Sequence, residues 1–185
     1  MKIIFSLLLL SLSACATFPD TTIEERITAS IEPQIGPVRK GAVVGILENG
    51  RPRFLTFGGL QENSIFEIAS LTKTFTSLLF SIAIEKGLVA PETTLGEIRE
   101  EWKRSKLGRI TLLELATHRS GLPRLPCDFH FKDKRNPYAD YSEDELVSSI
   151  SDVVIERSPE CRILPAPTKE SSYSNWGPAL LGNAL

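Results

Sequence analysis

Two short motifs carry four residues that could together perform acyl transfer: Ser70 and Lys73 in the first, and Tyr173 and Asn175 in the second. The first motif is Ser70-Leu71-Thr72-Lys73, and the second, about a hundred residues later, is Tyr173-Ser174-Asn175. A serine hydroxyl is a poor nucleophile until a base removes its proton, and a lysine can do so if its pKa falls far below about 10.4. The pattern therefore favours a hydrolase built on serine and lysine.

The first motif is weak by itself, and the second is much more specific. With 18 serines and 9 lysines in 185 residues, chance alone predicts about one Ser-x-x-Lys match. The alternative is that Ser70 is a helix N-cap and Lys73 a solvated side chain. Tyr-x-Asn is expected by chance only about 0.08 times, and it follows the first motif in the chain.

A helix must hold the first motif. Apolar residues recur at helical spacing after Ser70, and Lys86-Gly87 is a typical C-terminal cap. Ser70 is therefore expected at the helix entrance and Lys73 one turn later on the same face. The spaced apolar residues, which we expect to help bury Lys73, are Leu71, Phe75, Leu78, Leu79 and Ile82.

Four segments in order resemble the serine β-lactamase and penicillin-binding protein superfamily, in its class C and D-Ala-D-Ala carboxypeptidase branch. They are residues 65–75, 113–123, 136–141 and 173–182. The resemblance implies an α+β, β-lactamase/transpeptidase-like fold: an antiparallel sheet flanked by helices, plus a mostly helical subdomain. Within this branch, residues 136–141 resemble the carboxypeptidase and endopeptidase members most.

The resemblance also implies roles for the matching residues. Ser70 would be the acylated nucleophile, Lys73 would accept or relay its proton, and Tyr173 would be the partner acid/base. A phenol near two cations can ionise below its usual pKa of about 10. Asn175 would donate to the substrate amide and hold Lys73. The Ser70 backbone N–H would form half of an oxyanion hole.

The family's third motif, Lys/His-Ser/Thr-Gly, is absent after Asn175. Its strand supplies the second oxyanion-hole donor, so we expect this chain to be the N-terminal part of a longer protein whose remaining strands lie downstream. We do not expect residues 1–185 alone to be fully active.

The N-terminus predicts export. Residues 1–14 read as a signal peptide, too short to span a bilayer, and Leu12-Ser13-Ala14-Cys15 resembles a bacterial lipobox. Cys15 would then carry lipid, residues 15–22 would form a tether, and residues 23–185 would belong to the hydrolase domain. Ala16 favours the periplasmic face of the outer membrane, or the cell surface. The alternative is a plain signal peptide with an incidental cysteine.

The remaining elements agree with this fold. Residues 22–35 predict a helix, residues 42–47 and 53–57 a hairpin closed by Asn49-Gly50, and Thr111 and Ser142 two capping-box helix starts. The charges between Glu97 and Arg109 indicate a solvated helical face. In an exported protein Cys127 and Cys161 could be bridged or free, and the sequence leaves this open.

Composition and motifs exclude several other functions. Near-neutral charge of −2 and 42% apolar residues fit an ordinary globule and give no reason to expect nucleic-acid binding. No Gly-x-Ser-x-Gly elbow is present, and His118 near a helix end suits capping or packing better than catalysis. We expect no metal or cofactor.

The sequence therefore predicts a serine hydrolase that acts on β-lactams or cell-wall D-Ala-D-Ala peptides. Its expected partners are these small substrates and a lipid anchor, and its oligomeric state is open. Two alternatives stand: a class C-like esterase, and a non-catalytic or truncated lipoprotein that keeps the penicillin-binding fold.

Overall fold

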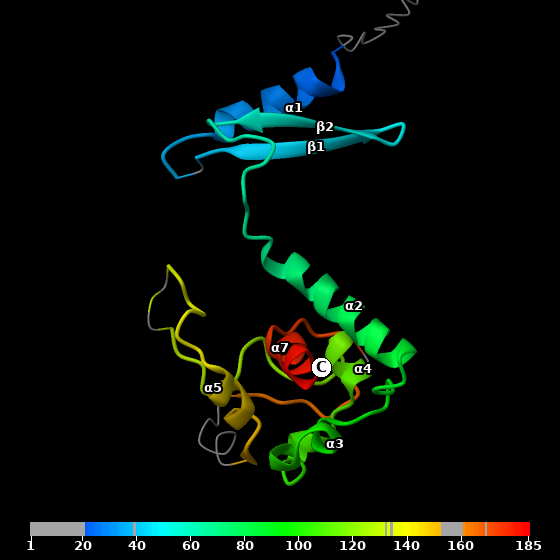
Figure 1. Cartoon of the computed structure of the whole chain (residues 1–185). Coiled ribbons are helices and arrows are strands. Elements are labelled where there is room, and N and C mark those ends of the chain that lie inside the picture. Colours follow the sequence, from blue (N-terminus) through cyan, green and yellow to red (C-terminus); the bar gives the residue numbers. More distant parts are fainter. Residues whose placement is uncertain (1–20, 39, 132, 134, 153–160, 169) are drawn as a thin grey trace, which may run out of the picture. The chain divides into compact units, whose positions relative to one another are not determined.

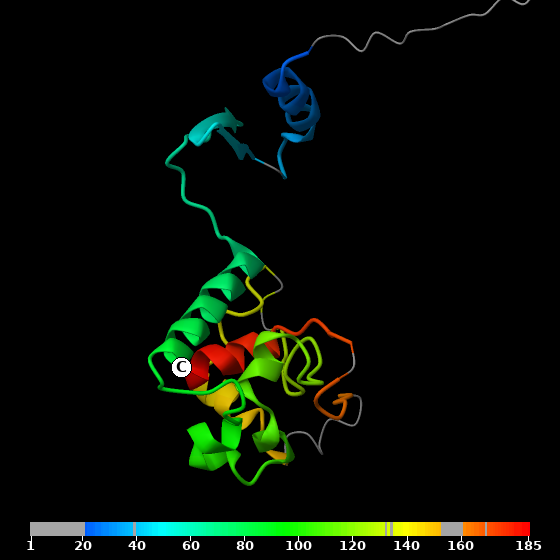
Figure 2. The same cartoon turned by 90° about the vertical axis from the view of Figure 1, so that its right-hand side faces the viewer.

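The computed structural model describes residues 21–38, 40–131, 133, 135–152, 161–168 and 170–185. The chain divides after Glu67 into two compact units, and each is described by itself. Helices occur with a small antiparallel sheet, which confirms the predicted α+β class (Figures 1 and 2). The predicted signal peptide and Cys15 lie outside the described residues.

The first unit begins with helix α1 (Ile23–Ile31) and a 3₁₀ turn, η1 (Glu32–Gln34). Thr22 caps α1 in a capping box with Glu25. The predicted helix over residues 22–35 is therefore correct in place but shorter, because Pro33 cannot continue the α-helical hydrogen bonding.

A hairpin completes the first unit. Strands β1 (Ala42–Glu48) and β2 (Arg51–Phe57) pair antiparallel, with Ala42 opposite Phe57 and Glu48 opposite Arg51. Asn49 and Gly50 both have positive φ, 50° and 76°, as a two-residue type I′ turn requires. The Asn-Gly signal thus predicted the hairpin, but the strands extend closer to the turn than expected, to Glu48 and from Arg51.

The second unit is helical, and it holds both chemistry-bearing motifs. Its α-helices are α2 (Thr72–Glu85), α3 (Leu95–Ile98), α4 (Leu112–Ala116), α5 (Glu143–Ser148) and α7 (Trp176–Ala184). Its 3₁₀ turns are η2 (Ala69–Leu71), η3 (Glu100–Trp102) and η4 (Lys106–Arg109).

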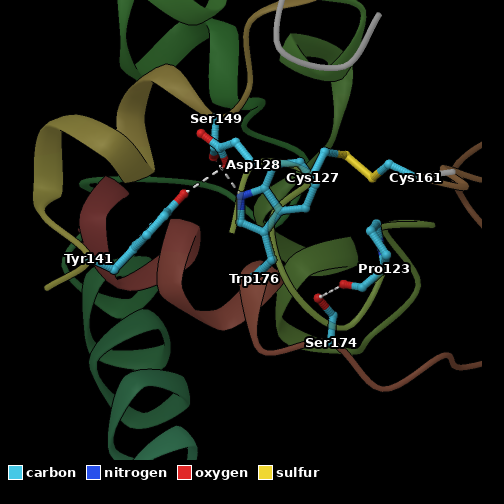
Figure 3. The surroundings of a disulfide bond; sticks show 8 residues. All are labelled: Pro123, Cys127, Asp128, Tyr141, Ser149, Cys161, Ser174 and Trp176. Carbon is cyan, nitrogen blue, oxygen red and sulfur yellow. Dashed lines mark hydrogen bonds between the residues drawn. A yellow bond between two sulfur atoms is a disulfide. The ribbon is translucent and has the colours of Figure 1, made fainter. Parts of the chain in front are cut away.

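Helix α7 lies at the centre of this unit and packs against α2, α4 and α5 (Figures 1 and 2). Trp176, Leu180 and Leu181 are at most 1% exposed, so the helix is apolar on nearly all sides, as a central helix should be. The indole N–H of Trp176 donates to Ser149 Oγ at 2.9 Å, which satisfies a buried polar group (Figure 3). Burial of α7 fixes the residues that precede it.

Helix α2 packs on this core through a different face from the expected one. Phe80 is its buried side chain, whereas Leu71, Phe75, Leu78 and Leu79 are each more than half exposed. The apolar spacing correctly predicts a helix that ends at Lys86-Gly87, with Gly87 at φ 67°. Spacing alone cannot tell which apolar edge of an all-round apolar helix is covered.

Capping boxes start both predicted helices, α4 at Thr111 and α5 at Ser142, and both are confirmed. A third box, Thr94 with Glu97, starts α3. The charged segment between Glu97 and Arg109 is not one helical face, because short turns replace a continuous helix and Trp102 is buried in the core.

A disulfide joins Cys127 to Cys161, whose Cα atoms are 5.4 Å apart (Figure 3). The bridge settles the alternative that the sequence left open. Cys127 packs against the core cluster, and the bridge closes a loop with a sequence separation of 34 residues. It therefore ties residues 161–168 to the loop after α4.

We predict that removing the bridge lowers the free energy of unfolding by about 4 kcal/mol, the chain-entropy value for a loop of this length. Thermal and urea unfolding of the double variant Cys127→Ser/Cys161→Ser would measure the loss. Cys15→Ser keeps the bridge and is the matched control. Equal unfolding midpoints for the double variant and the control would contradict the prediction.

Candidate active site

Ser70 lies in turn η2, immediately before α2, and its side chain is exposed. The preceding residue, Ala69, has a positive φ of 47°, which is uncommon for a residue with a Cβ and costs backbone energy. This turn presents the hydroxyl at the entrance of the helix, as the sequence predicts.

Lys73 lies one turn further along, in the first turn of α2. Its Nζ is 3.5 Å from Ser70 Oγ, and the residue is half-buried. The expected juxtaposition of ammonium and hydroxyl is present. The apolar stripe on α2 encloses Lys73 less than expected, because Phe75 and Leu78 are largely exposed.

Tyr173 comes from the segment before α7 and meets Ser70 directly. The two hydroxyl oxygens are 2.8 Å apart, and Lys73 Nζ lies 5.2 Å from the centroid of the tyrosine ring. Hydrogen bonding with Lys73, then with Ser70, lowers the pKa of Tyr173, and the charges of Lys73 and Arg124 add to the effect. The phenol is thus suited to exchange a proton with the serine.

Ser174 fixes the position of Tyr173. It is 1% exposed, and its hydroxyl donates to Pro123 O at 2.7 Å (Figure 3). The same hydroxyl accepts from Gly177 N–H at 3.0 Å. Its backbone N–H donates to His118 Nδ1 at 3.2 Å. A buried hydroxyl with both partners satisfied holds the second motif against the loop after α4.

Backbone hydrogen bonds extend this attachment. The carbonyls of Gly121 and His118 accept from Leu164 N–H at 2.9 Å and from Ser172 N–H at 2.8 Å. Gly121 has φ 73°, and a Cβ there would overlap the Leu164 backbone, so only glycine permits this approach. The loop after α4 therefore serves as the platform for the tyrosine motif.

His118 supports Tyr173 from the end of α4. Its backbone has φ 56°, and its ring centroid lies 4.8 Å from that of Tyr173. Burial, with a smaller contribution from the charge of Lys73, lowers the pKa of His118. Because Nδ1 accepts a hydrogen bond, the neutral ring must carry its proton on Nε2. The predicted packing role fits these contacts, but no sequence motif predicts that the ring contacts Tyr173.

Asn175 is the N-cap of α7, and its contacts differ in part from those expected. Its backbone N–H donates to Arg124 O at 2.8 Å, and its side-chain Nδ2 donates to the hydroxyl of Tyr138 at 3.3 Å. Among the described residues it has no hydrogen bond to Lys73. The backbone anchor on Arg124 directs the amide toward Tyr138, so the predicted role of holding Lys73 is not seen.

Three of the predicted site residues border a hollow of about 590 Å³. Its wall includes Ser70, Lys73 and Asn175, together with Arg124, Phe129 and Tyr138. Tyr138 falls in a segment that resembles the family, whereas Arg124 and Phe129 belong to no motif and were not predicted. The hollow is large enough for a small substrate placed on Ser70.

Within the described residues no group of three or more His, Cys, Asp or Glu side chains is arranged to hold a metal ion. None of the described helices is both long enough and apolar enough to cross a membrane.

Comparison with known proteins gives consistent matches. The family model described as Beta-lactamase matches residues 27–185. The chain is 33% identical over 135 residues to Beta-lactamase-like protein 2 of Dictyostelium discoideum, covering 67% of this chain and 22% of that protein. It is 29% identical over 126 residues to a β-lactamase of Escherichia coli (strain K12), covering 61% and 33%.

Solved structures are also similar. A β-lactamase from Sulfitobacter sp. EE-36 has a TM-score of 0.61 and 25% identity, covering 89% of this chain and 44% of that one. A β-lactamase/D-alanine carboxypeptidase from Pseudomonas syringae has a TM-score of 0.62 at 18% identity, covering 87% and 41%, and shows the fold alone. The chain spans about a fifth to a third of the curated relatives it matches.

We predict that acidification weakens the contact between His118 and Ser174. The folded-state pKa of His118 lies below 6.5, so the unfolded chain takes up its proton first. The neutral ring of His118 makes its full contribution to the free energy of unfolding above about pH 6.5. This contribution is lost as the pH falls below that value. Urea unfolding between about pH 8 and pH 5 would measure this.

The matched variant is His118→Asn, which keeps an acceptor, tolerates positive φ and does not titrate. Wild type should lose stability relative to this variant as the pH falls. His130→Asn, at an exposed site, should parallel wild type. Curves for wild type and His118→Asn that stay parallel would count against the contact.

Proposed function

Because this chain belongs to the β-lactamase family, we propose that it is a serine hydrolase that forms an acyl-enzyme at Ser70. The proposed substrates are β-lactams and cell-wall peptides that end in D-Ala-D-Ala. The observation that carries the proposal is the position of Ser70 Oγ, 2.8 Å from Tyr173 OH and 3.5 Å from Lys73 Nζ. This contact gives the nucleophile both a proton acceptor and a neighbouring cation.

Acylation would start with Tyr173 as the phenolate, held in that form by Lys73. The phenolate takes the proton of Ser70 while Oγ bonds to the substrate carbonyl carbon. The protonated Tyr173 then gives this proton to the amide nitrogen as the C–N bond breaks, which leaves an ester on Ser70 and returns the phenolate. The lowered pKa of Tyr173 supports both transfers, since an efficient acid/base has a pKa near the working pH.

Deacylation would reverse the roles with water in place of the amine. Tyr173 takes a proton from water, the hydroxide oxygen bonds to the acyl carbon, and Ser70 Oγ leaves with that proton. The Ser70 backbone N–H at the helix entrance would stabilise the oxyanion. The predicted downstream motif would supply the second donor in the whole protein.

Substrate class is the finer part of the proposal. One structural neighbour is named as both a β-lactamase and a D-alanine carboxypeptidase, and the curated relatives in bacteria are named as β-lactamases. These names favour the two related amide substrates over esters. We propose that the protein is an exported lipoprotein, anchored through Cys15 on the periplasmic face of the outer membrane or on the cell surface. There it would encounter both β-lactams and cell-wall peptides. This localisation rests on the sequence alone.

The proposed function predicts a covalent adduct. Incubating the protein with benzylpenicillin should add the mass of one penicillin, and peptide mass mapping should place the adduct on Ser70. Ser70→Ala should abolish labelling, because among the described residues no other serine hydroxyl contacts both a tyrosine hydroxyl and a lysine ammonium. Ser81→Ala removes an exposed serine of the same helix and should leave labelling unchanged.

An adduct retained in Ser70→Ala would contradict the assigned nucleophile. If the native protein forms no adduct, the result favours the alternative hypothesis of a non-catalytic lipoprotein that keeps the penicillin-binding fold. Labelling by an activated ester but by no β-lactam would favour the esterase.

The proposed function also predicts which residue accepts the proton of Ser70. Tyr173→Phe should slow acylation of Ser70 by about 10²- to 10⁴-fold, the usual size of general acid/base catalysis, because the ring stays while the hydroxyl is lost. Stopped-flow or quenched labelling would measure the second-order rate constant. Tyr138→Phe removes a phenol from the same hollow without touching Ser70 and should cost less than about tenfold. Similar losses in the two variants would argue against Tyr173.

A further inference from the structure

Arg124 places a second cation at the wall of the hollow. Its guanidinium carbon lies 5.1 Å from the ring centroid of Tyr173, on a residue that is exposed and that lines the hollow with Ser70 and Asn175. It forms no ion pair with any carboxylate of the described residues. The charge is therefore open to a ligand.

The backbone of Arg124 is rigidly held. Its carbonyl accepts the N–H of Asn175 at 2.8 Å, and the preceding carbonyl, of Pro123, accepts the hydroxyl of Ser174 at 2.7 Å. The guanidinium lies over the ring of Tyr173, and this cation–π contact limits the rotamers of the side chain. A site with a fixed backbone and a restrained side chain loses little entropy when it binds.

No carboxylate of the described residues occupies the N–H donors of the guanidinium. These donors lie in the plane of the group, where a carboxylate can accept two of them. The other charges of the hollow already have partners. Lys73 is directed to Ser70, and Glu143 accepts from Arg99 at 3.3 Å and from Asn183 at 2.8 Å.

The predicted role of Asn175 is to donate to the substrate amide. The backbone carbonyl of Arg124 accepts the N–H of Asn175, and both residues line the hollow with Ser70. We propose that Arg124 is a specificity-determining residue that selects substrates with a carboxylate on the acyl side. This inference rests on the proposed function, because it assumes that Ser70 is acylated.

Three penicillins that share one skeleton test the proposal: benzylpenicillin, its α-carboxy analogue and its α-amino analogue. The rate constant for labelling Ser70 is measured for each by mass spectrometry. In the native protein the α-carboxy compound should react about fivefold faster than benzylpenicillin, the factor for an exposed ion pair. The α-amino compound should react more slowly than benzylpenicillin.

Arg124→Gln should reduce these ratios to those set by intrinsic reactivity, determined from alkaline hydrolysis of the same compounds. Arg124→Lys, which keeps the charge but loses the planar fork, should retain part of the preference. Arg104→Gln removes an exposed arginine outside the hollow and should behave as the native protein. A ratio cancels any change in rate that all substrates share, such as an effect through Tyr173.

A second arm compares two acyl-D-Ala-D-Ala peptides with Glu or Gln before the first D-Ala. It distinguishes a preference for a carboxylate on an antibiotic from a preference for a carboxylate on a cell-wall peptide. A carboxylate preference that Arg124→Gln removes, in either arm, supports the inference. Unchanged ratios in both arms, with labelling by benzylpenicillin intact, overturn the inference and leave the proposed function standing. No labelling by any compound overturns both.

Discussion

The candidate site depends on the burial of one hydroxyl. Ser174 is enclosed by the core, where its Oγ bonds Pro123 O and the N–H of Gly177 at the start of α7. An unsatisfied hydroxyl at this depth would cost about 1–3 kcal/mol, so the second motif has one favourable position. Residues on either side of a fixed residue are fixed too, and this places Tyr173 on Ser70 and sets Asn175 at the rim of the hollow.

The charged side chains near Tyr173 then set its acid/base properties. Lys73 and Arg124 both lie close to the ring of Tyr173, and both cations favour its ionised form. Burial and the charge of Lys73 lower the pKa of His118, which also contacts this ring, and this favours the neutral form that accepts the Ser174 N–H. One set of contacts thus stabilises the fold, orients the phenol and tunes its pKa.

Local signals in the sequence were enough for much of this structure. Asn49-Gly50 and the capping boxes predicted elements because each acts within a few residues, and Ser70 and Lys73 meet because helical geometry brings them together. Contacts between distant segments, such as Asn175 with Tyr138, have no local signature. Arg124 follows a matched segment but belongs to no motif, so only the folded chain brings it to Tyr173.

The central claim is that the protein holds Tyr173 as an easily ionised phenol. The most direct measurement is a pH titration of the three tyrosines by NMR of ¹³Cζ-labelled tyrosine, with Tyr173→Phe for assignment. We predict that Tyr173 ionises below its usual pKa of about 10, and that Tyr141, half-buried beside Asp128, ionises well above it. Replacing Ser174 with alanine should move the pKa of Tyr173 back toward 10. A native Tyr173 with an ordinary or raised pKa would contradict the account.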